Sequence, residues 1–251
     1  MQARRGGYSA RSAIREDAKI HVSSPGYSGT DNLEVMREAV NYNRALLDLV
    51  KAHARTSDRL LDFGAGTGTF AIALAADGYD VECVEPDPGQ RAAIEAAGLR
   101  AHGGLAAIPV ASVDCAYTLN VLEHIEDDLA TIRALRDRLV RGGRLVVYVP
   151  AFQVLYTSMD RKVGHVRRYR RTDLRAKVET AGLTVLRSEY VDSLGFAASL
   201  AFRAFGSKSG DIDRDAVRAY DRYAFPLSRR LDRALNRVVG KNVLLVAQRN
   251  G

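Results

Sequence analysis

The sequence predicts an α/β fold: a doubly wound, mostly parallel seven-stranded sheet with a helical insertion before the last strand. Short apolar runs alternate with helical stretches from residue 59 onward, which is typical of parallel strands joined by helices. A glycine-rich turn follows the first expected strand, Arg59–Phe63. About 50 residues separate the last two expected strands, far more than a hairpin connection needs.

Apolar periodicity and turn residues predict the individual elements. We expect a leading helix from Asp31 to about Ala54, with Asp31 as its cap. Pro88 suits the first turn of a helix, and Thr172 and Gly182 suit the two ends of another. The other expected strands are Asp80–Val84, Leu99–His102, Ser112–Leu119, Arg144–Val149, Leu183–Val191 and Val243–Gln248. The expected helices between strands are Thr69–Ala76, Pro88–Ala97, Asp127–Val140 and Thr172–Ala181.

The chain divides into an arm and one domain. Residues 1–30 are rich in Gly, Ser and Arg without a clear period, so we expect a flexible N-terminal arm. Residues 31–251 are expected to form a single domain, in which residues 192–242 are a helical lid inserted before the last strand. The second half of that lid is helical in pattern, with a break expected at Pro226.

Composition excludes several classes of protein. The 251 residues are 47% hydrophobic and 27% charged, as in an ordinary soluble globular protein. Two cysteines exclude a disulfide-rich scaffold and a four-cysteine zinc module. No apolar run reaches the roughly 18 residues of a membrane span. The first residues carry the charges of a signal peptide without its apolar stretch, so we expect a cytoplasmic location.

The net charge of +7 is concentrated in one segment. Residues 161–177 contain eight basic residues and one acidic residue, Asp173, so the rest of the chain is nearly neutral. This pattern predicts a local patch that attracts anions and does not predict a broad nucleic-acid surface.

The most informative motif is the turn after the first strand. Gly64, Gly66 and Gly68 lie between that strand and the next helix, where glycines let a ligand approach the main chain closely. The helix N-terminus adds unpaired N–H groups. Glu85 ends the next strand, 23 positions after Asp62, and an acid near this offset binds ribose hydroxyls in doubly wound sheets.

The glycine spacing separates two classes of cofactor. A dinucleotide site requires G-x-G-x-x-G, whereas this turn is G-x-G-x-G with Thr69 at the position of the third glycine. The spacing therefore argues against a nicotinamide-dependent oxidoreductase, which we keep as a competing hypothesis.

The turn resembles motif I of the class I S-adenosylmethionine-dependent methyltransferases. Two later segments, Thr118–Glu126 and Leu139–Val147, resemble the family's segments after the fourth strand and into the fifth. The resemblance implies a seven-stranded sheet whose last strand is antiparallel. It also implies S-adenosylmethionine as the cofactor, bound at the C-terminal edge of the first, second and fourth strands. The cofactor contacts that it implies are Tyr42, Asp62, Gly64, Ala65, Gly66, Gly68, Glu85, Pro86 and Asn120.

Two histidines are candidate catalytic bases, because each follows a strand at the edge where ligands bind in such folds. His124 follows the fourth strand and His165 lies in the loop after the fifth, with Asp160 as a residue that could orient His165. The loop resembles that of a small-molecule methyltransferase subgroup, which implies a substrate-binding role for Arg167, Arg168 and Tyr169. Glu123 beside His124 is a weak metal signal, and no metal site is assigned.

The sequence thus predicts a methyltransferase acting on a small molecule, with O-methylation of an anionic or glycosylated metabolite favoured over N- or C-methylation. The acceptor is expected between the Met159–Tyr169 loop, the arm and the lid. An RNA or protein methyltransferase and a non-catalytic cofactor-binding protein are the alternatives. Apolar lid helices could instead form a homodimer contact.

Overall fold

The computed structural model describes residues 35–205 and 213–251. Two expectations fall outside these ranges: the N-terminal arm at residues 1–30 and the role of Asp31 as a helix cap.

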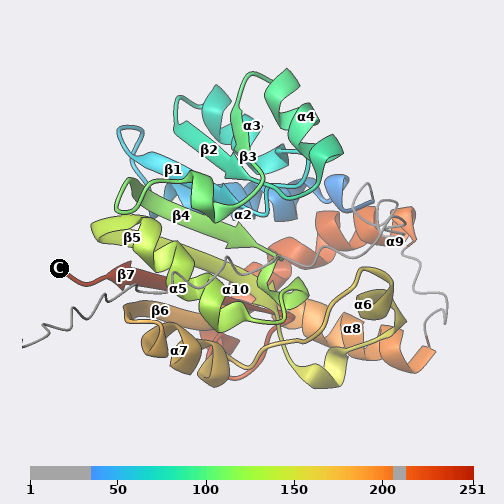
Figure 1. Cartoon of the computed structure of the whole chain (residues 1–251). Helices are drawn as coiled ribbons and strands as arrows, with labels where there is room; N and C mark the ends of the chain where they lie inside the picture. Colours follow the sequence, from blue (N-terminus) through green and yellow to red (C-terminus); the bar gives the residue numbers. More distant parts are fainter. Residues whose placement is uncertain (1–34, 206–212) are drawn as a thin grey trace, which may run out of the picture.

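Within the described residues, seven strands form one sheet in the order β3-β2-β1-β4-β5-β7-β6 (Figure 1). Strands β1 to β5 pair in parallel, whereas β7 is antiparallel to both β5 and β6. The predicted fold class is therefore confirmed, including the reversed last strand. The strands are β1 (Arg59–Phe63), β2 (Asp80–Val84), β3 (Arg100–His102), β4 (Val113–Leu119), β5 (Leu139–Pro150), β6 (Leu183–Val191) and β7 (Asn242–Arg249).

Helices cover both faces of the sheet (Figure 1). Successive strand residues point to opposite faces, so Leu60 packs with the core that includes α2, α3 and α4, while Leu61 packs with the core that includes α5 and α7. The helices are α2 (Val40–Lys51), α3 (Thr69–Ala76), α4 (Pro88–Ala96), α5 (Asp128–Arg138), α6 (Ser158–Lys162), α7 (Arg171–Thr180), α8 (Ser193–Phe205), α9 (Arg214–Ala219) and α10 (Phe225–Leu235). None of the helices in the described ranges is long and apolar enough to cross a membrane.

Several predicted boundaries differ from the structure by one or two residues, and the start of β5 differs by five. β5 begins at Leu139 and not at Arg144, because the polar Arg–Gly–Gly stretch forms an irregularity within the strand. A Cβ atom at Gly143 would lie 2.9 Å from the Val140 carbonyl oxygen, so this position requires glycine. α7 begins one residue before Thr172, whose hydroxyl bonds to Asp173, so Thr172 is not the N-cap.

The leading helix is broken where a single helix was predicted. A helical turn at residues 35–37 ends before Ala39, which has non-helical dihedral angles, and α2 begins at Val40. The break lets a distant carboxylate cap α2: Asp221 accepts hydrogen bonds from the backbone N–H groups of Asn41 (2.9 Å) and Tyr42 (2.8 Å). The sequence around residue 39 carries no sign of a partner 180 positions away.

The described helices between β6 and β7 are α8, α9, the π-helical segment η4 (Tyr220–Ala224) and α10, which we call the insertion helices. Pro226 does not break the helix as predicted, because α10 follows η4 directly and Pro226 occupies its first turn. The wider π turn shifts the backbone hydrogen-bond pattern immediately before Pro226, which has no N–H group to donate. Asp232 fixes the start of α8 by accepting the N–H groups of Asp192 and Ser193, each at 2.8 Å.

The contact of Asp221 with the start of α2 should stabilise the fold, because it joins the insertion helices to α2. We expect Asp221→Ala to lower the free energy of unfolding by about 1–2 kcal/mol, the scale of losing a helix cap. Urea denaturation measures this difference. Asp215→Ala is the matched control, because that side chain belongs to α9 and is 89% exposed. Equal midpoints for the two variants would show that the contact contributes nothing.

Candidate active site

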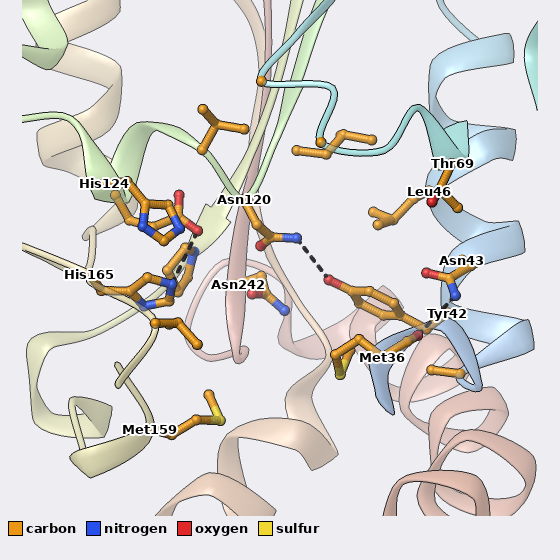
Figure 2. A pocket seen from close by; sticks show the side chains of 18 of the residues that line it. Met36, Tyr42, Asn43, Leu46, Thr69, Asn120, His124, Met159, His165 and Asn242 are labelled. Atoms are coloured by element: carbon orange, nitrogen blue, oxygen red, sulfur yellow. Dashed lines mark hydrogen bonds and ion pairs between the residues drawn. The ribbon is translucent and has the colours of Figure 1, made fainter. Parts of the chain in front are cut away.

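A cavity of about 1220 Å³ opens at the C-terminal edge of the parallel strands. Its wall combines the loops after β1, β2, β4 and β5 with α2, the insertion helices and the start of β7. In Figure 2, His124 and His165 lie on one side and Tyr42 and Asn43 on the other, with Asn120 between them. The topology thus brings residues from both ends of the chain to one edge of the sheet.

The glycine turn needs left-handed backbone at all three glycines, with φ values of +79° at Gly64, +58° at Gly66 and +79° at Gly68. A Cβ atom at Gly64 would lie 2.5 Å from the Val121 side chain. At Gly66 the nearest atom to such a Cβ would be the Gln90 side-chain oxygen at 3.5 Å, so the space beside Gly66 belongs to the cavity.

Glu85 ties this turn to the end of β2. One carboxylate oxygen accepts the Gly66 N–H at 2.8 Å and the other accepts the Asp87 N–H at 3.0 Å. Burial raises the pKa of Glu85, and the two backbone hydrogen bonds oppose that shift. Because Glu85 also lines the cavity, its oxygens keep acceptor capacity for hydroxyl groups of a ligand.

Asp62 has a buried carboxylate oxygen without a protein partner. The residue is 3% exposed, lines the cavity, and its Oδ2 makes no hydrogen bond. Burial, assisted by the negative charge of Glu85, raises the pKa of Asp62 to about 7. An unpaired buried carboxylate costs free energy, and a ligand ammonium group would offset that cost.

Asn120 and Tyr42 meet across the cavity. Asn120 directly follows β4 and has a positive φ of +57°, and its Nδ2 donates to the Tyr42 hydroxyl at 3.3 Å. The Tyr42 ring packs edge-on against Tyr148 and Phe225, with centroids 6.1 Å and 5.7 Å away. Burial raises the pKa of Tyr42 to about 12, so its hydroxyl stays protonated at neutral pH.

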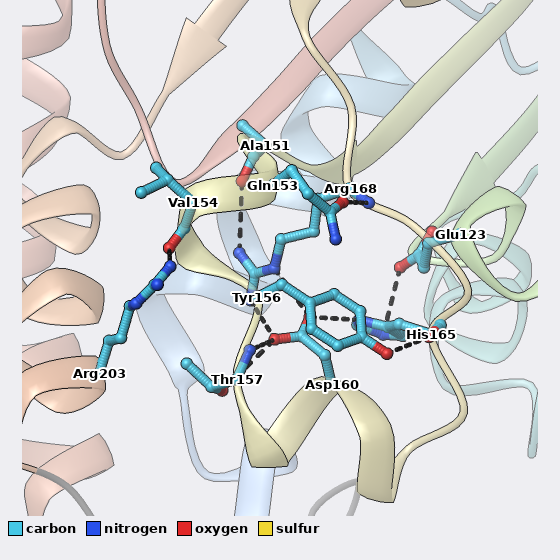
Figure 3. Close-up of polar contacts among 10 residues, drawn as sticks. All are labelled: Glu123, Ala151, Gln153, Val154, Tyr156, Thr157, Asp160, His165, Arg168 and Arg203. Carbon is cyan, nitrogen blue, oxygen red and sulfur yellow. Dashed lines mark hydrogen bonds and ion pairs between the residues drawn. The ribbon is translucent and has the colours of Figure 1, made fainter.

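Asp160 holds His165 and Arg168 in one network (Figure 3). Its Oδ1 lies 2.7 Å from His165 Nδ1, and Arg168 donates to both carboxylate oxygens, at 2.8 and 3.0 Å. Burial alone would raise the pKa of Asp160, but the hydrogen bonds from His165 and Arg168 lower it to about 2. In a neutral imidazole, the ionised Asp160 favours the proton on Nδ1, so that Nε2 is the acceptor nitrogen.

Glu123 and His124 adjoin this network. The His124 and His165 rings pack edge to face with centroids 4.7 Å apart. Burial, with a smaller contribution from His165, lowers the pKa of His124 to about 4, so His124 is neutral at pH 7. Glu123 is fully buried, and burial raises its pKa to about 8.

The structure does not bring Arg167 and Tyr169 into the cavity, although both were predicted to bind the substrate. Arg167 donates to the carbonyl oxygens of Ile125 and Glu126 and pairs with Asp128, whose carboxylate also accepts the Tyr169 hydroxyl. These side chains hold the loop after β5 in place from outside the cavity. Arg168 does line the cavity, but Asp160 neutralises its charge.

The predicted anion patch is correspondingly weakened. Besides Arg167 and Arg168, Lys177 pairs with Asp128 at 2.6 Å and Arg175 pairs with Glu179 at 2.9 Å. At least four of the eight basic residues of the segment therefore have an acidic partner.

Sequence reasoning missed Asp192, Lys241 and Asn242, which line the cavity from the insertion and the start of β7. Burial lowers the pKa of Lys241, and the Asn242 Nδ2 atom is buried without a hydrogen-bond partner. The reversed direction of β7 was a usable signal, because it brings the first residues of that strand to the same edge as the ends of the parallel strands.

Comparisons with known proteins agree with this fold. A methyltransferase-domain family model matches residues 35–188. No curated protein matches the chain. A Haloferax volcanii methyltransferase, solved in complex with the Trm112 activator, is similar with a TM-score of 0.63 and 17% identity over 90% of this chain and 95% of that one.

Two other solved structures show the same fold. The Haemonchus contortus phosphoethanolamine N-methyltransferase 2, solved with S-adenosyl-L-methionine, has a TM-score of 0.58 and 15% identity over 84% of this chain and 53% of that one. The [4+2]-cyclase SpnF has a TM-score of 0.56 and 18% identity over 91% of this chain and 98% of that one.

The fold and this edge define a class I S-adenosylmethionine-dependent methyltransferase, and the chain belongs to the methyltransferase family. S-adenosylmethionine is its cofactor. The residues present fit that group: an orphaned carboxylate oxygen at Asp62, open space beside Gly66 and the acceptor oxygens of Glu85 face one cavity.

We expect Gly66→Val to abolish binding of S-adenosylhomocysteine in calorimetry, because the new side chain would occupy the cavity. Gly78→Val is the matched control. Gly78 also has a left-handed backbone (φ +88°), but nothing lies within 4 Å of the position that its Cβ would take. Both variants carry a backbone cost of about 1–2 kcal/mol. Equal affinities would contradict the placement of the cofactor beside this turn.

The affinity for S-adenosylhomocysteine should depend on pH through Asp62. Its pKa of about 7 means that the carboxyl group is protonated at lower pH and must lose a proton to receive the ligand ammonium. Affinity should therefore fall by up to about tenfold for each pH unit below 7 and level off above it. Calorimetry from pH 5.5 to 8 should show this slope in the wild type, and Asp62→Asn should flatten it. An unchanged slope in the variant would exclude Asp62 as its source.

Proposed function

We propose that the chain transfers the methyl group of S-adenosylmethionine to a hydroxyl group of a small molecule held inside the cavity. The observation that carries this proposal is one continuous cavity lined both by the glycine turn and by His165. Its volume of about 1220 Å³ exceeds the roughly 300–1,000 Å³ typical of a single-ligand site. It therefore has room for a cofactor and a second small molecule, and the insertion helices serve as the lid over both.

For the cofactor, we assign the ribose hydroxyls to Glu85 and the amino group to Asp62. The turn residues Gly64, Ala65, Gly66 and Gly68, together with Pro86, Asn120 and Tyr42, complete the proposed contacts. When bound, the cofactor supplies an already activated methyl group, so the protein mainly aligns the acceptor with it.

For the acceptor, we assign activation of the hydroxyl to His165, which lines the cavity and is positioned by Asp160. The free lone pair on Nε2 is the feature that suits this role. His124 is a wall of the acceptor site next to His165, and the unpaired Asn242 amide offers a polar contact. Lys241 replaces Arg167 and Tyr169 as the group that would favour an anionic acceptor.

Two observations favour a small acceptor over RNA or protein. The acceptor site is covered by α8 and η4, which line the cavity. RNA-binding surfaces use unpaired basic side chains and exposed aromatic rings, whereas much of the basic segment here is paired with acids.

Isotope transfer tests the acceptor class. With a methyl-labelled cofactor and a cell extract divided by size, label should enter the small-molecule fraction, and mass spectrometry of that fraction identifies the product. Label confined to the RNA or protein fraction would overturn the proposal. No transfer to any fraction would support a non-catalytic role.

We expect His165→Ala to lower kcat for that acceptor by about 10²–10⁴-fold, the usual contribution of a proton-transfer group. Asp160→Asn should also lower it, because the imidazole loses its orienting carboxylate. Affinity for S-adenosylhomocysteine should stay at the wild-type value in both. His102→Ala is the control, since His102 pairs with Glu82 at the β3 edge, outside the cavity lining. A full rate in His165→Ala would remove this residue from the mechanism.

A further inference from the structure

Three potential metal ligands converge at the acceptor end of the cavity. Glu123, His124 and His165 each offer one ligand atom, and these atoms lie within 4.8 Å of one another. Within this cluster, His165 Nε2 lies 3.7 Å from Glu123 Oε1. All three residues line the cavity. Among the described residues, no other group of three or more such side chains meets this condition.

Glu123 supplies an independent observation that points to a cation at this cluster. The residue is fully buried, and neither of its carboxylate oxygens has a hydrogen-bond partner. Its backbone is fixed, because the Glu123 carbonyl accepts the Val166 N–H at 2.8 Å. Burying a carboxyl group without a hydrogen bond costs free energy, and a cation here would take one carboxylate oxygen of Glu123 and one nitrogen of each histidine.

The surrounding contacts orient His165 as a metal ligand. Asp160 Oδ1 holds its Nδ1 at 2.7 Å, which leaves Nε2 directed toward Glu123. A carboxylate bound to the far nitrogen of a ligating histidine is the usual second layer of a metal site. Arg168 in turn fixes Asp160 through two hydrogen bonds, so the ligand geometry is set by buried contacts.

We propose that Glu123, His124 and His165 bind one divalent first-row transition-metal cation. Two imidazole nitrogens and one carboxylate oxygen suit Zn²⁺, Mn²⁺, Fe²⁺ or Co²⁺ better than Mg²⁺ or Ca²⁺, which prefer oxygen ligands throughout. Ligand bonds of about 2.0–2.2 Å separate the ligands of a tetrahedral site by roughly 3.3 Å. The side chains reach that spacing by moving on the order of one ångström.

Three protein ligands leave coordination positions for the acceptor. A hydroxyl oxygen bound there becomes more acidic, as does water on zinc. With Nε2 ligated, activation of the hydroxyl passes from the imidazole to the cation. This consequence rests on the proposed function, whereas binding of the cation does not. Both mechanisms need His165, so the alanine variant does not separate them.

Titration of the chelator-treated full chain with Co²⁺ tests the site without any acceptor. We expect visible d–d absorption bands that saturate at one cation per chain, and competition by Zn²⁺ but not by Mg²⁺. Glu123→Gln should weaken Co²⁺ binding by at least tenfold. Asp160→Asn should weaken it by about 10–100-fold, the usual effect of removing a second-layer partner.

The control is Glu82→Gln, which alters another Glu–His pair, Glu82 with His102 at 2.6 Å. This variant should bind Co²⁺ as the wild type does. S-adenosylhomocysteine affinity, measured for every variant, shows that the cavity is folded. Absence of binding in the wild type, or equal affinity in wild type and Glu123→Gln, would overturn the metal site.

Methyl transfer assays separate this inference from the proposed function. Cation binding without methylation of a hydroxyl would leave the metal site standing and refute the proposed function. Methylation by a chain that binds no cation and is insensitive to a chelator would support the proposed function and refute the metal site.

Discussion

The bond between the Glu85 carboxylate and the Gly66 N–H is the contact on which the cofactor end of the site depends. It joins the turn after β1 to the residue that follows β2, and Gly66 takes a left-handed backbone there. The same turn leaves open space beside Gly66 and places Asp62 behind it, with one oxygen unpaired. Main-chain geometry thus shapes the wall of the cavity beside Gly66.

The end of the cavity at His165, to which we assign the acceptor, is built on a different principle. There, side chains do the positioning: Asp160 holds His165 and Arg168, and Asp221 attaches the insertion helices to α2. Each carboxylate accepts several hydrogen bonds at once, which makes the arrangement specific but sensitive to single substitutions. Backbone conformation therefore determines the shape of the cavity near Gly66, whereas buried polar networks determine the positions of the side chains near His165.

Local signals explain why most of the fold was predictable. β1, β2, α3 and β6 begin and end where the sequence indicated, because each couples a clear apolar period to a turn residue. Contacts distant in sequence explain the errors: the break at Ala39 needs Asp221, and the start of β5 depends on its pairing with β4. Gly66, Glu85 and His165, which were named from motifs, all line the cavity. The roles of Arg167 and Tyr169 were misassigned, because the Asp128 that pairs with them lies about 40 positions away and only the tertiary fold reveals it.

The most direct test of this account is a crystal structure with S-adenosylhomocysteine. We expect both ribose hydroxyls within hydrogen-bonding distance of Glu85, the amino group at the unpaired oxygen of Asp62, and the sulfur facing the His165 end of the cavity. A ligand bound elsewhere, or one in the cavity whose ribose does not touch Glu85, would contradict the central claim.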